Sequence, residues 1–288
     1  MICRTLLFSL IALAASGQQA KNIVSPDWTK PFAPFRIVGN VYYVGTWDLA
    51  CYLITTPQGN ILINTGLADS VPQLLSNVEN LGFRFSDIKI LLATHGHWDH
   101  VSALAEVKRL TGARVQATEA ETTLLESGGK TDFRFGADSF AWYAPVKVDE
   151  RLKDQQKISF GGMELTVQLH PGHTKGAASY SFNVKDGGHD YSVLIANMGS
   201  INPGVTLLDN ANYSNIASDY ARTFELQKAL HPQIWLPSHA SQFGLHEKFK
   251  TGDPYQPARF VDPEGYQRAV KQLESVYLKQ LDQERGKK

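Results

Sequence analysis

Short apolar runs separated by turn residues fill the opening part of the chain. Residues 40–46, 49–56 and 59–64 have the length and composition of strands, and Pro57-Gln58-Gly59 supplies a turn between the last two. Residues 88–93 form a continuous apolar run, which is typical of a strand covered on both faces. The pattern predicts a strand-rich opening that leads into a buried strand.

Helical spacing of apolar residues follows these strands. It predicts a helix over residues 71–81, which ends near Gly82, and a second helix over residues 101–110, which ends at Thr111-Gly112. A further short strand is expected at residues 115–117.

The second half of the chain repeats this alternation. Because strands and helices alternate twice, we expect an α/β fold in which two sheets pack together and carry helices on their outer faces. The predicted strands cover residues 162–169, 177–184, 191–196 and 234–236, and the predicted helices cover residues 216–230 and 263–281.

The first residues of the chain have a different pattern. Arg4 precedes an almost wholly apolar run over residues 5–15, and Ala15-Ser16-Gly17 offers the small residues that a signal peptidase reads. This predicts a secretory signal peptide over residues 1–17, a single domain over residues 18–288 and a periplasmic location. A buried N-terminal helix is the alternative. The run is too short to span a bilayer, and no later stretch is apolar enough to do so.

Composition narrows the class of protein. Lys plus Arg and Asp plus Glu each number 28, so the formal net charge is zero. A nucleic-acid partner would normally require a basic excess or stripe, and the sequence has neither. Cys51 is the one cysteine outside the predicted signal peptide, so a disulfide within the mature chain is excluded. Its apolar neighbours predict a thiol that packs as a small hydrophobic group.

Candidate chemistry is concentrated directly after the 88–93 strand. His95-Gly96-His97-Trp98-Asp99-His100 holds four potential metal ligands in six residues. His95 and His97 are two positions apart, so both point to one side of an extended segment. Asp99 and His100 lie where the next helix begins and can turn toward a second point. The loop can therefore serve two neighbouring metals, with Trp98 either as a wall of the site or packed within the loop.

Two more histidines follow predicted strands, His173 in Pro171-Gly172-His173-Thr174 and His239 in Leu236-Pro237-Ser238-His239. Loops past strand ends gather at one edge of layered sheets, which is where sites form. Imidazoles with one carboxylate and no thiolate suit zinc best, with iron or manganese as rivals. Three histidines with an open fourth position describe a catalytic zinc, whose bound water has a pKa near ~7. Of the other histidines, only His170 is close enough for a supporting role.

The pattern His95-x-His97-x-Asp99-His100, together with His173 and His239, resembles the signature of the metallo-β-lactamase superfamily over roughly residues 35–285. The resemblance implies an αββα sandwich, in which two mixed β-sheets carry helices on their outer faces and metals at one edge. The superfamily includes lactamases, glyoxalase II enzymes, lactonases, sulfatases, nucleases and flavodiiron proteins. The motif therefore predicts the fold and the metal-binding residues more reliably than it predicts the substrate.

The residues after the predicted 191–196 strand indicate which subclass of the family the chain resembles. Many superfamily hydrolases carry a metal-bridging Asp there, and other lactamase subclasses carry a Cys, but this chain has Asn197-Met198-Gly199-Ser200. The ligand set is therefore similar to that of subclass B3. Three stretches resemble its GOB-like and FEZ-like branch, namely Asn64-Thr65-Gly66-Leu67, Ser127-Gly128-Gly129-Lys130 and Ser238-His239-Ala240-Ser241-Gln242-Phe243. The chain departs from the branch at His95, where GOB-like enzymes commonly have Gln, and from many subclass members at Met198, where they have Ser.

The resemblance implies two zinc ions per chain and a mechanism. A hydroxide bound between the zinc ions would attack the carbonyl carbon of a β-lactam amide, with Asp99 and His97 as catalytic residues and Asp99 orienting the nucleophile. Ser200 and Asn202 are the candidates for binding the substrate carboxylate, although they could also be ordinary loop residues. The implied ligands are His95, His97 and His173 for the first ion, and Asp99, His100 and His239 for the second.

These observations predict a β-lactam hydrolase that acts on penicillins, cephalosporins and carbapenems and confers antibiotic resistance. Its partner is a small-molecule substrate, with no nucleic acid and no membrane, and we expect a monomer. The loop over residues 126–142, with its glycines and aromatic residues, should border the substrate. The alternatives are a lactone or thioester hydrolase on the same fold, and a non-catalytic zinc-binding protein.

Overall fold

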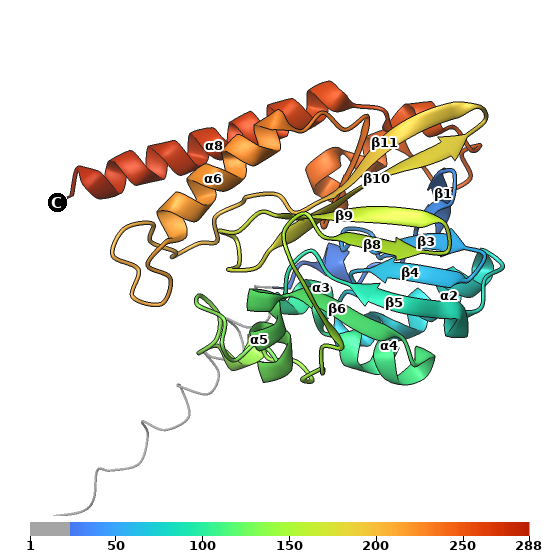
Figure 1. Ribbon diagram of the computed structural model, residues 1–288, viewed down its shortest axis with the longest axis horizontal. Coiled ribbons are helices and arrows are strands. Elements are labelled where there is room, and N and C mark those ends of the chain that lie inside the picture. Colours follow the sequence, from blue (N-terminus) through green and yellow to red (C-terminus); the bar gives the residue numbers. More distant parts are fainter. Residues whose placement is uncertain (1–23, 288) are drawn as a thin grey trace, which may run out of the picture.

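The computed structural model describes residues 24–287, so the predicted signal peptide lies outside the described residues. Two β-sheets pack face to face (Figure 1). In the first sheet β1 to β4 are antiparallel and β4 to β7 are parallel. Its seven strands, in spatial order, are β1 (Phe35–Val38), β2 (Val41–Tyr43), β3 (Tyr52–Thr56), β4 (Gly59–Ile63), β5 (Ile88–Leu92), β6 (Arg114–Thr118) and β7 (Glu150–Leu152).

The second sheet has five strands. Neighbouring strands are antiparallel except for β11 and β12, which run parallel. In consequence β9, β11 and β12 all point the same way, and their carboxyl ends meet at one edge. The spatial order is β12 (Ile234–Pro237), β11 (His189–Ala196), β10 (Ala178–Asp186), β9 (Met163–Leu169) and β8 (Lys157–Phe160).

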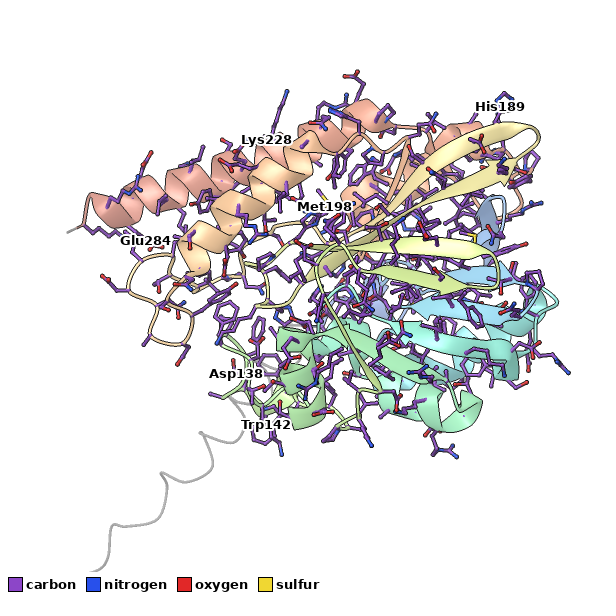
Figure 2. The ribbon with its side chains drawn as sticks, viewed as in Figure 1. Asp138, Trp142, His189, Met198, Lys228 and Glu284 are labelled. Atoms are coloured by element: carbon purple, nitrogen blue, oxygen red, sulfur yellow. The ribbon has the colours of Figure 1, made fainter. Side chains whose placement is uncertain are left out.

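Helices cover the outer sides of both sheets (Figure 1). On the first sheet these are α2 (Val71–Asn80), α4 (Leu104–Thr111) and α5 (Glu119–Ser127), and on the second they are α6 (Ile216–Ala229) and α8 (Pro263–Arg285). Lys228 of α6 pairs with Glu274 of α8 at 2.6 Å (Figure 2). Two single turns complete the helices, α3 (Trp98–Val101) and α7 (Leu245–Lys248). Among residues 24–287 no helix is long and apolar enough to cross a bilayer.

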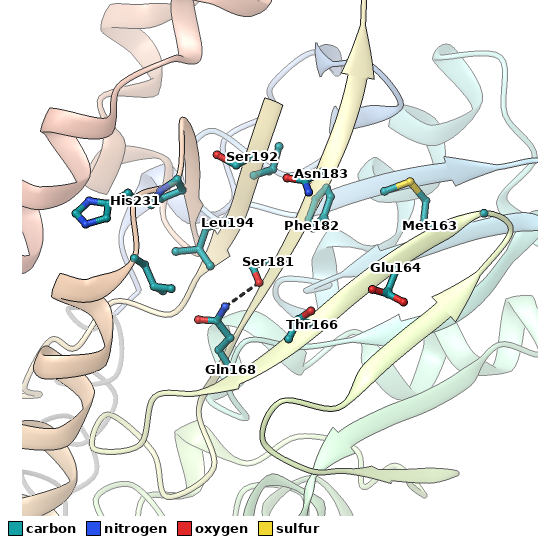
Figure 3. A pocket seen from close by; sticks show the side chains of 14 residues that line it. Met163, Glu164, Thr166, Gln168, Ser181, Phe182, Asn183, Ser192, Leu194 and His231 are labelled. Atoms are coloured by element: carbon teal, nitrogen blue, oxygen red, sulfur yellow. Dashed lines mark hydrogen bonds between the residues drawn. The ribbon is translucent and has the colours of Figure 1, made fainter. Parts of the chain in front are cut away.

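Part of the outer face of the second sheet is polar. Thr166, Gln168, Ser181 and Asn183 line a cavity of about 460 Å³ between this face and the turn that precedes β12 (Figure 3). The Gln168 amide donates a hydrogen bond to the Ser181 hydroxyl at 2.7 Å. Polar side chains at alternate positions are expected where no helix covers a strand.

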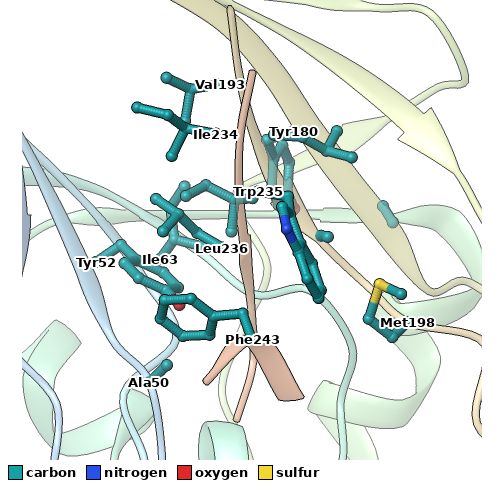
Figure 4. Close-up of a cluster of buried hydrophobic side chains, with 14 of the residues drawn as sticks. Ala50, Tyr52, Ile63, Tyr180, Val193, Met198, Ile234, Trp235, Leu236 and Phe243 are labelled. Atoms are coloured by element: carbon teal, nitrogen blue, oxygen red, sulfur yellow. The ribbon is translucent and has the colours of Figure 1, made fainter. Parts of the chain in front are cut away.

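The main core lies between the two sheets, and alternation along the strands builds it. Ile61 and Ile63 of β4 face the second sheet, whereas Leu62 faces the helices of the first. Tyr52 and Ile63 share the inter-sheet cluster with Tyr180 of β10 (Figure 4). The β5 run is also divided between the two core clusters, which confirms the prediction of a strand covered on both faces. Cys51 is buried with its thiol unpaired, as expected.

The αββα sandwich expected from the resemblance is confirmed, and most elements begin and end within a few residues of the predicted positions. The helix predicted over residues 101–110 is wrong at its start, because α3 begins at Trp98 and a break separates it from α4. At the break the Ala103 N–H donates to the Gly66 carbonyl at 3.2 Å, so a tertiary contact interrupts the helix. The sequence patterns missed β1, β7, β8 and α5.

Two tyrosine hydroxyls join the sheets at the edge where the strands end. The Tyr180 hydroxyl donates to the Ala93 carbonyl at 2.8 Å, just before His95. The Tyr52 hydroxyl donates to the Pro237 carbonyl at 2.6 Å, just before His239. These bonds connect each sheet to a candidate ligand segment on the other sheet.

We expect Tyr180→Phe and Tyr52→Phe each to lower the free energy of unfolding by about 1–3 kcal/mol, because each leaves a buried or partly buried carbonyl without its donor. Chemical denaturation measures the change. Tyr191→Phe is the control, since its hydroxyl makes no hydrogen bond to any residue between 24 and 287. Equal stabilities for all three variants would contradict the assigned role of these hydroxyls.

Candidate metal centre

The segment after β5 presents its ligands on a tight loop and a single helical turn. His97 is the N-cap of α3, which places Asp99 and His100 in the first turn of this short helix. The four side chains of His95, His97, Asp99 and His100 are all buried. A Cβ on Gly96 would lie 2.8 Å from both Glu121 Oε2 and Leu124 Cδ2, so a larger residue here would force one of these buried side chains to move.

The structure brings the predicted ligands from three distant segments together. His97 Nδ1 lies 3.1 Å from His173 Nε2, and one ligand atom each from His95, His97 and His173 lie within 4.8 Å of one another. Asp99 Oδ2 lies 3.1 Å from His100 Nε2 and 3.4 Å from His239 Nε2. His95, Asp99 and His100 form a second group within 4.8 Å, so His95 lies between two clusters.

These separations suit metal ions. Ligand atoms about 2.1 Å from a tetrahedral zinc are about 3.4 Å from each other, which is close to the 3.1 to 3.4 Å found here. His95 Nε2 is buried and has no hydrogen-bond partner among the described residues. An unpartnered buried ring nitrogen is costly unless a cation or a water molecule meets it. The donor set therefore fits a metal cofactor.

The second nitrogen of most of these rings has its own partner, which fixes the orientation of the ring. His239 Nδ1 lies 2.9 Å from Asp48 Oδ2. His97 Nε2 lies 3.3 Å from Asp132 Oδ2, but this approach does not have the geometry of a hydrogen bond. His173 Nδ1 donates to the Ser200 carbonyl at 2.8 Å. His95 Nδ1 is 3.3 Å from the Thr94 hydroxyl.

The electrostatics of the cluster lower the pKa values of His95, His100 and His173, raise those of His97 and His239, and favour an ionised Asp99. Burial lowers the pKa of His173 to about 3, and burial with the neighbouring histidines holds the pKa of His95 well below its usual range. Burial alone would raise the pKa of Asp99, but His100 and His239 hold it well below its usual value. Burial also opposes the proton on His239, yet Asp48 and Asp99 raise its pKa to about 9.

One buried glutamate braces two of the ligand segments. Glu121 Oε1 accepts hydrogen bonds from the Thr174 hydroxyl at 2.6 Å and the Gly176 N–H at 2.9 Å. Its other oxygen accepts the Gly96 N–H. Burial raises the pKa of this carboxyl, and the hydrogen bonds oppose the rise. Glu121 thus ties the loop that carries His95 and His97 to the loop that carries His173.

A cavity of about 150 Å³ opens beside the cluster. Trp28, Trp98 and Phe135 form an aromatic wall, which confirms the role of Trp98 as a wall and places one residue of the 126–142 loop at the cavity. Ser200 and Asn202 contribute polar groups to the lining, as does Gln242. The larger cavity of Figure 3 shares no lining residue with this one.

Met198 also lines the cavity beside the ligand cluster, where many relatives are expected to have an acid or a serine. It follows β11 and is only 5% exposed (Figure 2). A thioether is a weak metal ligand and a weak hydrogen-bond acceptor, so the part of the cavity that Met198 lines is apolar. His170 is buried nearby, but its side chain contacts Ser179 and Gln227 and touches none of the six ligands.

The sequence patterns found every ligand candidate but missed the residues behind them. Asp48 lies between β2 and β3, Asp132 lies in the 126–142 loop and Glu121 lies in the unpredicted helix α5. Single acids without a spacing pattern carry no signal in one sequence. Ser200 was expected to meet substrate, and its carbonyl additionally orients His173.

The fold and the site have clear relatives. The family model of the metallo-β-lactamase superfamily matches residues 45–191 of this chain. The metallo-β-lactamase GOB-18 from Elizabethkingia meningoseptica is 47% identical, with a TM-score of 0.88 over 90% of this chain and 96% of that chain. The class B3 di-zinc enzyme LRA-12 from an Alaskan soil metagenome is 46% identical, with a TM-score of 0.87 over 89% and 97%. FEZ-1 from Legionella gormanii is 40% identical, with a TM-score of 0.86 over 88% and 97%.

Curated relatives match less of their own length. Hydroxyacylglutathione hydrolase of Bartonella tribocorum is 33% identical over 33% of this chain and 30% of that protein. That of a Bradyrhizobium strain is 31% identical over 46% of this chain and 42% of that protein. The aligned segments therefore span less than half of these relatives. The chain belongs to the metallo-β-lactamase superfamily, and its predicted resemblance to subclass B3 is confirmed.

We expect Glu121→Gln to weaken both the fold and metal retention, because an amide has one acceptor oxygen where the carboxylate uses two. The free energy of unfolding should fall by about 1–3 kcal/mol. Denaturant titration and metal analysis after dialysis against a weak chelator measure the two effects. Glu119→Gln on the same helix is the control, since its carboxylate pairs only with exposed Arg151. A Glu121 variant as stable and metal-rich as this control would contradict the bracing role.

Proposed function

We propose that the protein is a zinc-dependent β-lactam hydrolase with two zinc ions per chain. The convergence of six ligand side chains from three segments, at separations that suit zinc, carries this proposal. Overall similarity to solved class B3 enzymes supports it. In this proposal His95, His97 and His173 hold the first ion, and Asp99, His100 and His239 hold the second.

Zinc in such a site supplies Lewis-acid polarisation of a carbonyl and makes hydroxide available near neutral pH. The side chains of the protein orient the attacking water and the ligand rings. Asp99 is buried and ionised and lines the cavity, so it can accept a hydrogen bond from an attacking water and set its direction. His97 Nδ1 bonds to His173 Nε2 and its Nε2 lies 3.3 Å from Asp132 Oδ2, which places its ring at the first site. No side chain has to form a covalent intermediate.

The substrate would lie between the aromatic wall and the loop after β11. Ser200 and Asn202 can donate hydrogen bonds to the carboxylate of a β-lactam. The described residues that line the cavity include no Lys or Arg, so neutral donors would have to hold that carboxylate. The apolar surfaces of Trp28 and Phe135 suit the side chain of a penicillin, cephalosporin or carbapenem.

A thioester or lactone hydrolase is the second candidate. The partial matches to hydroxyacylglutathione hydrolases favour it. Met198 argues against it, because it stands where many such enzymes are expected to carry a bridging carboxylate. Side-by-side assays with nitrocefin and S-lactoylglutathione separate the two activities.

We expect Asp99→Ala and His173→Ala to lower kcat/KM for a carbapenem by several orders of magnitude, because each removes a ligand from a catalytic zinc site. Metal removal should abolish hydrolysis, and added zinc should restore it. Metal analysis and absorbance assays with and without chelator measure both effects. Full activity in the metal-stripped protein would overturn the proposal, and zinc binding without any turnover would indicate a non-catalytic zinc protein.

Ser200→Ala and Asn202→Ala provide the contrast within the same assay. Neither side chain is a proposed ligand. Ser200→Ala removes the 3.3 Å contact of its hydroxyl with His173 Nδ1 but retains the shorter 2.8 Å hydrogen bond to the Ser200 carbonyl, which orients the ring. We therefore expect KM to rise several-fold while zinc content and kcat change little, since a lost ground-state contact acts mainly on KM. Unchanged KM in both variants would remove these residues from the substrate site.

The proposed cellular setting is the periplasm, where a monomer exported through residues 1–17 would meet antibiotics and confer resistance. The charged start, apolar run and small residues of that segment support export. We expect the full chain, but not a chain that lacks residues 2–17, to reach the periplasm of a bacterial host and raise its resistance to a β-lactam. Cell fractionation and growth on the antibiotic test this, and equal export of both chains would refute it.

A further inference from the structure

One carboxylate, Asp132, contacts both a proposed metal ligand and the loop that borders the cavity. Its side chain is only 4% exposed, and its Oδ2 lies 3.3 Å from His97 Nε2. Its Oδ1 accepts the backbone N–H groups of Arg134 at 2.8 Å and Phe135 at 2.6 Å. The two oxygens therefore serve different partners, one in the metal centre and one in the loop.

The turn at Asp132 determines where Phe135 lies. The Phe135 ring lines the cavity, with its centroid 5.3 Å from that of His97 and 5.2 Å from that of Trp98. The Arg134 guanidinium stacks over Phe135 at 4.7 Å, and Arg134 Nε donates to the Pro203 carbonyl at 2.8 Å. A shift of this turn would therefore move the aromatic wall and the carboxylate behind His97 together.

We propose that Asp132 is a positioning residue that couples the loop of residues 126–142 to the metal ligand His97. The inference rests on the proposed zinc site. His97 Nδ1 faces His173, so a metal at Nδ1 leaves the ring proton on Nε2. Asp132 Oδ2 lies 3.3 Å from this nitrogen but is not aligned for a hydrogen bond, so metal binding would have to turn the ring and complete the bond. The coupling is reciprocal: metal bound at His97 orders the loop, and an ordered loop strengthens metal binding.

Asp132→Asn separates the two contacts. The amide oxygen can still accept both N–H groups of the turn, whereas the amide nitrogen cannot accept the proton of His97 Nε2. We expect zinc affinity, measured by chelator competition, to fall by about 10- to 100-fold. The visible spectrum of the cobalt-substituted protein should change as well, because the ring of a ligand is reoriented.

Hydrogen–deuterium exchange over residues 129–142 reports the coupling directly. In the wild-type protein, zinc should slow amide exchange in this segment by an order of magnitude or more relative to the metal-free protein. In Asp132→Asn this zinc-dependent slowing should be lost, although the turn itself remains. A purely structural role would instead speed exchange equally with and without zinc.

Asp138→Asn is the matched control, with the same substitution in the same loop (Figure 2). The Asp138 carboxylate lies 3.4 Å from Arg134 Nη1 and forms neither a hydrogen bond nor an ion pair with His97. Zinc affinity, the cobalt spectrum and the zinc-dependent slowing of exchange should all stay at the wild-type level in this variant.

Either of two results overturns the coupling. One is wild-type zinc affinity together with wild-type slowing in Asp132→Asn. The other is amide exchange in the wild-type loop that does not respond to zinc. This second test uses only the wild-type protein, so it does not depend on whether a variant folds. The proposed function is tested separately by β-lactam turnover of the wild-type protein. Zinc binding and loop slowing without turnover would refute the proposed reaction and support the coupling.

Discussion

The burial of imidazole nitrogens against one another is the constraint on which the rest of this structure depends. His97 Nδ1 and His173 Nε2 approach to 3.1 Å, so either a ring proton on one nitrogen or a metal cation must lie between them. Two lone pairs that face each other away from water are unfavourable without one of these. The sandwich must therefore hold these rings together by other means until a metal binds. Hydrogen bonds between the two sheets supply that support.

Neutral groups provide much of this support. The Thr94 and Ser238 hydroxyls lie 2.7 Å apart and connect the segment of His95 to that of His239. Asn64, with a positive φ of 64°, accepts the Thr94 N–H at 3.0 Å and reaches toward Ser238 with its amide nitrogen. An amide can both donate and accept here, which a carboxylate could not do.

Each of the two proposed metal sites has one acid that contacts a ligand ring from behind. Asp132 reaches the first site through His97, and Asp48 reaches the second through His239. Each of these carboxylates also accepts backbone N–H groups from a neighbouring turn, at Phe135 and at Ser241. The orientation of the ligand rings is therefore linked to the conformation of the loops around the cavity. Met198 does not add a further charge to this wall, so the negative charge of the centre rests on Asp99 and the acids behind the rings.

The sequence by itself predicted most of the strands, six candidate ligands and the family, because apolar periodicity and the spacing from His95 to His100 are local properties of the chain. It did not predict the break between α3 and α4, where the carbonyl of Gly66 captures the N–H of Ala103. Nor did it identify Asp48, Glu121 and Asp132, which stand alone in the sequence. Only tertiary packing brings these acids behind the ligand segments, because their partners lie up to 191 residues away along the chain.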